Sequence, residues 1–557
     1  MKTLFRIICA ICVMLWATSC KEFLTEDPKG RLASVYFFSG PADLDASLHA
    51  LYYNIGNCVR TNLRSCQNLL MGDDLSTHPA MNKVNFREYD QYFVSTANTD
   101  VLNHWQRHWQ IIKNANFIIN NAGRTPGVSE REILDVLTQA HYWRAYAYFY
   151  IVRSWGPVPI MLEEKIDYNA SLNSIEEIYD LILSDLTIAE DCRITYDREP
   201  YAINGRNRAV GQAAVKATMS YVYMSMAGWP LNKGTEYYAK AAAKAKEVID
   251  GVGNGTYKYE LLDEYRKIHL WAYNNNHPEL LLGYFWNFAA SHTNQSPRCD
   301  ISSEVIQDGW NDTQGEIKFW KKFPNSPRKD ASYLPKIILK SGKGELLDWW
   351  EDYDPPSRVS IAPCFMKTAE SATVGAEFDY KDTRALPSNQ EKAYHFIRLA
   401  EVYCWYAEAL GRSGNVNQDA IDLLNIVRNR ADGFGPVKDR SAVPVPSGDH
   451  VPVYTNYYPN NMSAAALADS AYTEHGWEIA GYYRGNIAAR YWDMYRMYRV
   501  KQHFEFRKQN PLIEVAPGVW RREAVELHAN DNKEWSDDRM WSPYPIDDVR
   551  LNPNLKR

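Results

Sequence analysis

The sequence has 557 residues, a formal net charge of −6 at pH 7 and an aromatic content of 13%, with 18 Trp and 38 Tyr. The mildly acidic balance argues against nucleic acid as a partner, because binding to phosphate needs a basic surface. The length alone suggests three or four domains at ~100–200 residues each. In a chain this long, a hydrophobic core rather than disulfides must carry the stability.

The N-terminus has the layout of a secretory signal peptide. Lys2 and Arg6 precede a short apolar run over residues 7–16, which is followed by Ala17-Thr18-Ser19-Cys20. The run is too short to span a bilayer, which takes ~20 apolar residues. We expect residues 1–19 to be removed and Cys20 to be lipidated, although Ala17 stands where a lipobox has Leu. A soluble periplasmic protein cut after Ser19 is the alternative.

Apolar residues at helical spacing predict a mostly α-helical fold. Ser174 is a good N-cap, with Glu176 and Glu177 favourable in the first turn behind it. Trp155-Gly156-Pro157 stops another long helix. The predicted helices run over 41–55, 101–122, 130–153, 174–191, 208–227, 235–250, 391–410 and 418–430.

Two of the predicted helix pairs resemble each other. Residues 221–249 and 399–427 both predict a helix, a Gly-containing turn and a second helix, with Ala407, Ala409 and Ala420 as small positions. Small residues let two helices pack closely, so the pattern favours tetratricopeptide-like hairpins. Two unrelated hairpins are the alternative.

Residues 251–390 lose the helical period and are rich in Pro, Gly, Asn and Trp. A second, shorter irregular stretch over 433–461 is rich in Pro and Tyr. Both are too long for simple connections and are expected to be structured functional loops. We therefore predict a helical scaffold over about 41–250 and 391–500 that carries a loop-rich insertion over about 251–390.

Motifs for familiar catalytic chemistry are absent. The sequence contains no Gly-x-Ser-x-Gly, no phosphate-binding Gly-x-x-x-x-Gly-Lys-Ser/Thr and no His-Glu-x-x-His. An acidic run, Asp348, Glu351, Asp352 and Asp354, could hold calcium through oxygen ligands, but it lacks the fixed spacing of a calcium loop. A solvated loop is the favoured interpretation, and no cofactor is expected.

The cysteines do not predict a metal site. Six cysteines follow Cys20, and no two of them form a Cys-x-x-Cys pair. They are Cys58, Cys66, Cys192, Cys299, Cys364 and Cys404. Cys58 and Cys66 could form a disulfide in an oxidising compartment. Buried free thiols are an equally good interpretation.

Blocks in order along the whole chain after Cys20 resemble the SusD/RagB family of outer-membrane nutrient-binding lipoproteins. The most recognisable block is Arg144-Ala145-Tyr146-Ala147-Tyr148-Phe149 followed by Trp155-Gly156-Pro157-Val158-Pro159. The other similar blocks are Phe23 to Pro28, His104 to Ile119, Arg398 to Leu410, Glu474 to Arg496, Pro543 to Ile546 and Asn552 to Leu555.

The resemblance implies a single mostly helical domain over 20–557 with tetratricopeptide-like hairpins and a loop-rich ligand face. It implies a lipid-anchored protein of the outer membrane, facing the cell exterior, that captures an oligosaccharide and caps a SusC-like TonB-dependent transporter. It also implies that the protein is not an enzyme. A peptide-binding member of the same fold, or a surface glycosidase, are the alternatives.

We expect the ligand site on loops 60–100 and 251–390, because binding residues sit preferentially on loops held by a rigid scaffold. Trp residues can stack on sugar rings, and neighbouring polar groups can bond hydroxyls. The helix-borne Trp105, Trp109, Trp143 and Trp405 are assigned to packing. The candidate ligand-binding residues are Trp310, Trp286, Trp349, Trp350, Trp271, Trp320, Tyr353, Asn82, Tyr89, Asp308 and Asn311.

Overall fold

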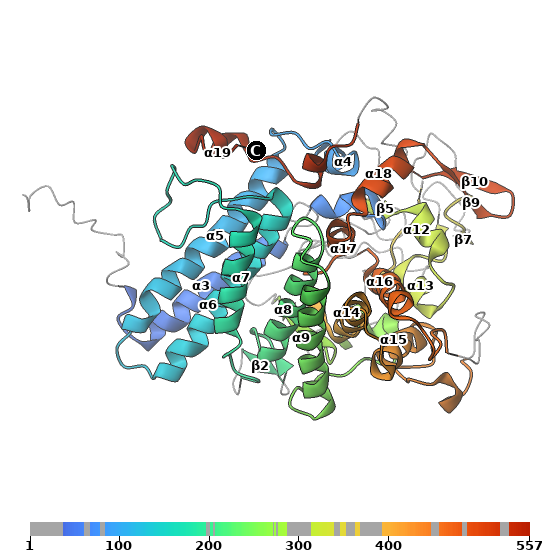
Figure 1. Ribbon diagram of the computed structural model, residues 1–557, viewed down its shortest axis with the longest axis horizontal. Coiled ribbons are helices and arrows are strands. Elements are labelled where there is room, and N and C mark those ends of the chain that lie inside the picture. Colours follow the sequence, from blue (N-terminus) through green and yellow to red (C-terminus); the bar gives the residue numbers. More distant parts are fainter. Residues whose placement is uncertain are drawn as a thin grey trace, which may run out of the picture.

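The computed structural model describes most of the chain after the predicted leader (Figure 1). The described residues are 37–60, 67–77, 84–196, 201–203, 206–270, 272–273, 277–286, 313–338, 346–351, 362–367, 393–446, 456–481, 487–523 and 534–556.

The fold is mostly α-helical, as predicted. The helices are α3 (Pro41–Arg60), α4 (Val84–Asp90), α5 (Thr99–Asn121), α6 (Glu130–Trp155), α7 (Ile175–Ala189), α8 (Gln212–Ala227), α9 (Thr235–Gly253), α12 (Ile317–Lys322), α13 (Pro327–Ser332), α14 (Leu399–Arg412), α15 (Gln418–Ala431), α16 (Ala464–Ile479), α17 (Arg490–Arg496), α18 (Val500–Lys508) and α19 (Ile546–Leu551).

The long helices pack side by side in a continuous row. Helix α3 lies against α5, which is followed by α6, α7, α8 and α9 (Figure 1). Helix α9 then packs against α14, and α14 contacts both α15 and α16. The row forms the scaffold, and α12, α13 and α18 lie at the end beyond α16.

Local sequence signals set several helix ends. Ser174 caps α7 in a capping box, in which its side chain accepts from the backbone N–H of Glu177 and the Glu177 carboxylate accepts from Ser174. Helix α6 ends at Trp155, and Gly156 takes a φ of +72°, which suits glycine. Both boundaries match the sequence prediction.

The helix predicted over 391–410 begins later, at Leu399. Residues Tyr394–Arg398 form strand β8 instead, which pairs antiparallel with β4 (Leu280–Tyr284). Apolar residues in a run of this length fit a strand or a helix equally well. The partner strand lies more than a hundred residues earlier, so the local pattern could not decide.

The other strands form short antiparallel pairs. Within the described residues, these are β1 (Leu75–Thr77) with β5 (Thr313–Gly315), β2 (Ala202–Ile203) with β3 (Arg206–Asn207), β6 (Ile337–Ile338) with β7 (Leu346–Leu347), and β9 (Leu512–Ala516) with β10 (Val519–Arg522).

Small residues allow close helix packing, as predicted. Ala407, Ala409 and Ala420 are fully buried. A methyl group at Gly411 would clash with the carbonyl oxygen of Ala464 and the backbone of Ala468, so α14 and α16 approach closely there. The hairpins α8–α9 and α14–α15 have the expected form, and their relation as tetratricopeptide-like repeats stays a prediction.

The main hydrophobic core runs through the whole row of helices. It contains residues from Phe38 near the start of the described chain to Leu555 near its end. Trp105, Trp143 and Trp405 lie inside it, with 3% of the side chain exposed or less. Trp109 packs against its edge. The sequence assignment of these tryptophans to packing is confirmed.

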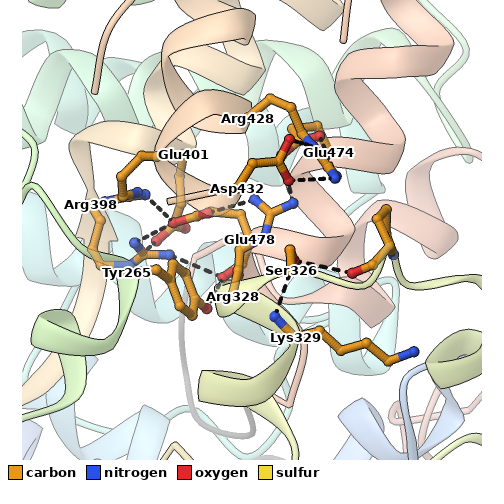
Figure 2. A network of polar contacts seen from close by, with 12 residues as sticks. Tyr265, Ser326, Arg328, Lys329, Arg398, Glu401, Arg428, Asp432, Glu474 and Glu478 are labelled. Carbon is orange, nitrogen blue, oxygen red and sulfur yellow. Dashed lines mark hydrogen bonds and ion pairs between the residues drawn. The ribbon is translucent and has the colours of Figure 1, made fainter. Parts of the chain in front are cut away.

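A cluster of buried charges, which we call the ion network, ties α13, α14, α15 and α16 to the β4–β8 pair (Figure 2). Arg328 bonds Glu478 at 2.9 Å, Arg398 bonds it at 2.8 Å and Arg430 at 2.6 Å. Glu279 accepts from Arg398 and Arg430 at 2.8 and 2.7 Å. These side chains have no exposed surface.

The charges of the ion network stabilise one another. Burial alone would raise the pKa of Glu478, but Arg430, Arg398 and Arg328 outweigh burial and hold the pKa well below its usual range. A carboxylate that is ionised and fully paired in the core fixes the geometry of the elements that supply its partners. The network is thus part of the scaffold.

No helix within the described residues is both long enough and apolar enough to cross a membrane.

Candidate functional site

Three tryptophans meet at one end of the molecule, beside α12. Trp320 lies on α12, and Trp349 and Trp350 follow β7. The ring centroid of Trp320 lies 5.4 Å from that of Trp349 and 5.5 Å from that of Trp350. The Trp349 and Trp350 rings are nearly perpendicular. The three rings therefore form a corner, and the sequence had already proposed all three as ligand contacts.

The corner is supported from below by a small hydrophobic cluster, separate from the main core. Trp349 belongs to this cluster with Ile317, Ile337 and Val515, and only 2% of it is exposed. Trp320 and Trp350 pack on the cluster and remain half-buried. Trp349 is thus mainly a packing residue, whereas Trp320 and Trp350 keep surface that a ligand can reach.

These rings border a hollow of about 460 Å³, which we call the tryptophan cleft. That volume lies within the ~300–1,000 Å³ of typical ligand pockets. The cleft is lined by Trp320, Lys321, Asn325, Lys329, Asp330, Tyr333, Leu334, Pro335, Trp349, Trp350 and Val515.

Lys329 places a positive charge against one of the rings. Its Nζ lies 4.3 Å from the centre of the Trp320 ring and donates to the carbonyl oxygen of Phe323 at 3.2 Å and to Oδ1 of Asn325 at 3.3 Å. Burial lowers the pKa of Lys329 to about 8. The ammonium group covers part of the Trp320 ring through a cation–π contact.

The cleft combines flat aromatic surface with polar groups. The exposed Asn325 has its carboxamide oxygen engaged by Lys329, which leaves its NH₂ group to donate to a ligand. Asp330 is exposed at the rim. Arg521 donates to the carbonyl oxygen of Trp350 and fixes the segment after β7 against β10. This arrangement suits a ligand that has an apolar ring face and several hydroxyl groups.

Two other candidates lie in the main core. Tyr89 has no exposed surface, and its hydroxyl lies 3.1 Å from Oγ of Ser542. Trp286 is 4% exposed and packs on Tyr284 with a centroid separation of 4.8 Å. Side chains with so little exposed surface contact protein rather than a ligand, because no ring face is open to solvent.

The remaining predicted ligand contacts, together with the lipidation site Cys20, lie outside the described residues. They are Asn82, Trp271, Asp308, Trp310, Asn311 and Tyr353.

Sequence reasoning missed the polar half of the cleft. Lys329 and Asn325 were not singled out, although the segment from Phe319 to Lys329 places three lysines and an asparagine around Trp320. An aromatic residue with cations and amides within one or two helical turns is a usable signal for a polar, ring-stacking site. The sequence cannot show which of these side chains face the cleft.

Two further expectations concern charges and thiols. Asp348 accepts from Nζ of Lys336 at 2.8 Å, and Glu351 accepts from the backbone N–H of Asp348 at 2.8 Å, so these two members of the acidic run already have protein partners. Cys58 is a buried free thiol, and burial raises its pKa to about 12. This matches the free-thiol interpretation of Cys58.

Family comparisons match both ends of the chain. The model described as "Starch-binding associating with outer membrane" matches residues 22–224, and the model described as "SusD family" matches residues 373–557. A SusD-like protein of Bacteroides ovatus is 24% identical over 448 residues, covering 76% of this chain and 76% of that protein.

Solved structures share the fold. A SusD homologue from Bacteroides thetaiotaomicron superposes with a TM-score of 0.70 at 17% identity, covering 94% of this chain and 97% of the other. A crystal structure with a xylogluco-oligosaccharide superposes with a TM-score of 0.64 at 20% identity, covering 92% and 98%.

The helical row with its short strand pairs is therefore a fold that this chain shares with these solved structures. Together, the two family models match more than two thirds of the chain, which belongs to the SusD/RagB family.

Proposed function

We propose that this protein binds oligosaccharides at the outer face of the outer membrane and delivers them to a TonB-dependent transporter. The observation that carries the proposal is the tryptophan cleft, where the half-buried rings of Trp320 and Trp350 meet the polar groups of Asn325 and Lys329. Sugar rings have an apolar face and a polar edge, and this lining offers a surface for each.

The relatives support the ligand class. One structural neighbour was solved with a xylogluco-oligosaccharide, and one matching family model is described as starch-binding and associated with the outer membrane. The fold is shared over almost the whole chain, so a saccharide ligand is the natural first class to test.

A binding role fits the described cleft better than hydrolysis does. Glycoside hydrolysis uses two carboxyl groups, ~5–10 Å apart, on either side of the scissile bond. Among the described lining residues, Asp330 is the one carboxyl group and lies at the rim. The proposal is therefore capture without cleavage.

The experiment that tests ligand class is a binding screen of the purified chain without residues 1–20 against immobilised neutral glycans, anionic glycans and peptides. Binding of at least one glycan, with no release of reducing ends on prolonged incubation, supports the proposal. Binding of peptides alone would favour the peptide-binding alternative, and release of shorter sugars would favour the glycosidase.

Anchoring and transport need a second experiment in cells. Cys20→Ala should move the protein from the membrane fraction to the soluble fraction, and gentle detergent extraction of the parent should recover a large TonB-dependent barrel with it. A variant that stays in membranes when the transporter gene is deleted would contradict the lipid anchor. A parent recovered without a barrel, under conditions that preserve such complexes, would contradict the transporter partner.

A further inference from the structure

A second hollow lies across α12 from the tryptophan cleft. It has a volume of about 310 Å³ and is bordered by Lys318, Lys322, Arg490 and Arg499, with Phe319 and Tyr472 as aromatic walls. We call it the basic cleft. Its side chains come from α12, α16, α17 and the start of α18, which lie together at this end of the molecule (Figure 1).

The acid within the basic cleft is already engaged. Asp73 binds Arg490 through both carboxylate oxygens, at 2.6 and 2.9 Å from Nε and Nη2. Arg490 in turn stacks over the Tyr472 ring at 4.5 Å. This two-point pair neutralises Arg490 and holds it as part of the wall.

The other cations of the basic cleft are Arg499, Lys322 and Lys318, and among the described residues their side chains form at most one long ion pair. Arg499 has its guanidinium 3.8 Å from Asp469, near the limit for an ion pair, and 38% of its side chain is exposed. Lys322 is exposed and has no ion pair among the described residues. Lys318 places its Nζ 3.4 Å from the Phe506 ring centre rather than on a carboxylate.

The groups that face Lys318 show why its charge is not compensated. Burial and the charge of Lys322 lower the pKa of Lys318, while Glu523, Asp73 and Glu316 act in the opposite direction. Burial, however, raises the pKa of Glu316 to about 7 and the pKa of Glu523 well above its usual value. A raised pKa favours the neutral form of a carboxyl group, so both shifts reduce the negative charge beneath the cleft.

This concentration of positive charge is local, because the chain as a whole carries a net charge of −6. A cleft lined by one sign of charge focuses its field and attracts ligands of the opposite sign. Lys318 and Lys322 lie four residues apart on α12, where like charges repel weakly, and an anion bound in the cleft would relieve that repulsion.

We propose that the basic cleft is a subsite for the anionic groups of an acidic oligosaccharide, either uronate carboxylates or sulfate esters. The inference rests on the proposed function and names its ligand class. The two clefts share α12, and a helix with its side chains is only ~10–12 Å across. Sugar rings that stack on Trp320 or Trp350 can therefore continue towards Lys318 and Lys322.

The test compares matched glycans. The probes are oligogalacturonates, oligoalginates, and chondroitin and heparin oligosaccharides. The first two are paired with their neutral methyl esters, whereas chondroitin and heparin, which also carry uronate carboxylates, are compared in desulfated, methyl-esterified and doubly treated forms, of which the last is neutral. Calorimetry on the parent should show at least tenfold tighter binding of one anionic probe than of its neutral form. Which neutralisation abolishes binding distinguishes carboxylate from sulfate recognition.

Variants locate the effect. Lys322→Gln should weaken that binding roughly two- to fivefold, since exposed charge contacts are each worth ~0.2–1 kcal/mol. The double variant Lys318→Gln/Lys322→Gln should weaken it tenfold or more and flatten its salt dependence. Lys113→Gln on α5, an exposed lysine that lines neither cleft, should bind like the parent.

Each other outcome is decisive. If the best ligand is a neutral glycan and Lys322→Gln binds it like the parent, the basic cleft is not an anion subsite, although the proposed function stands. If no glycan binds, both proposals fail. If poly-glutamate binds as tightly as any anionic glycan and Lys322→Gln weakens it equally, the cleft recognises acidic peptide and the saccharide subsite is wrong.

Discussion

In the ion network every arginine has carboxylates within hydrogen-bonding distance. In the basic cleft, the ammonium groups of Lys318 and Lys322 form no ion pair with a carboxylate among the described residues, although the Glu523 carboxylate accepts from the backbone N–H of Lys318 at 2.9 Å. The charged side chains of the network have no exposed surface and are paired with one another. In the cleft, Lys322 is exposed and 38% of the Arg499 side chain is exposed, on a protein whose net charge is −6. The contrast separates arginines and glutamates that hold helices together from lysines that remain available to a ligand.

The largest expected effect is at Glu478, in the ion network. We expect Glu478→Gln to lower the free energy of unfolding by ~3–5 kcal/mol, because removing one member of a buried ion cluster leaves the arginines uncompensated. Urea unfolding followed by circular dichroism measures this. Glu236→Gln, which removes an exposed carboxylate paired with Lys240 on α9, should unfold like the parent. A Glu478→Gln variant as stable as the parent would show that the network does not carry stability.

The second prediction concerns Trp350 in the tryptophan cleft. Trp350→Ala should weaken binding of the glycan found in the screen by about tenfold or more, since a central binding residue is worth ~2 kcal/mol. Calorimetry measures the affinity, after a melting curve has shown that the variant is folded. Trp520→Ala removes a tryptophan that is 51% exposed and lines neither described cleft, and should bind normally. Early melting of Trp350→Ala with unchanged affinity would assign Trp350 to packing.

The smallest expected effect is at Lys329. This lysine is intermediate between the buried ion network and the basic cleft, because it is only 9% exposed but borders the tryptophan cleft. Burial lowers its pKa from 10.5 to about 8 in the folded state. Between about pH 8 and 10.5 the unfolded chain therefore binds more protons than the folded protein, so this lysine makes stability rise with pH. Below pH 8 it is charged in both states and its unfavourable burial is constant.

The measurement is the free energy of unfolding of the parent and of Lys329→Met at intervals from pH 7 to 10. The difference, parent minus variant, should increase steadily above pH 8. The same difference for the exposed Lys113→Met should stay flat. Parallel profiles for the parent and Lys329→Met would mean that Lys329 keeps an ordinary pKa.

The sequence by itself determined the helices whose signals are local. Ser174 with Glu177 predicted the start of α7, and Gly156 with Pro157 predicted the end of α6, because capping and backbone conformation depend on residues a few positions apart. The tryptophans of α5, α6 and α14 were assigned to packing from their helical spacing. Family blocks such as Arg398 to Glu401 and Glu478 also stood out, and they supply members of the ion network.

The tertiary structure alone decided what depends on distant parts of the chain. Tyr394–Arg398 became a strand because Leu280–Tyr284 lies beside it. Composition placed Trp286, Trp349 and Trp350 in one group of candidates, but burial is a property of the packed molecule and separates Trp286 in the core from Trp350 in the cleft. The same holds for charge, since nothing local distinguishes Arg430, neutralised by Glu279 and Glu478, from Lys322, which has no carboxylate partner among the described residues.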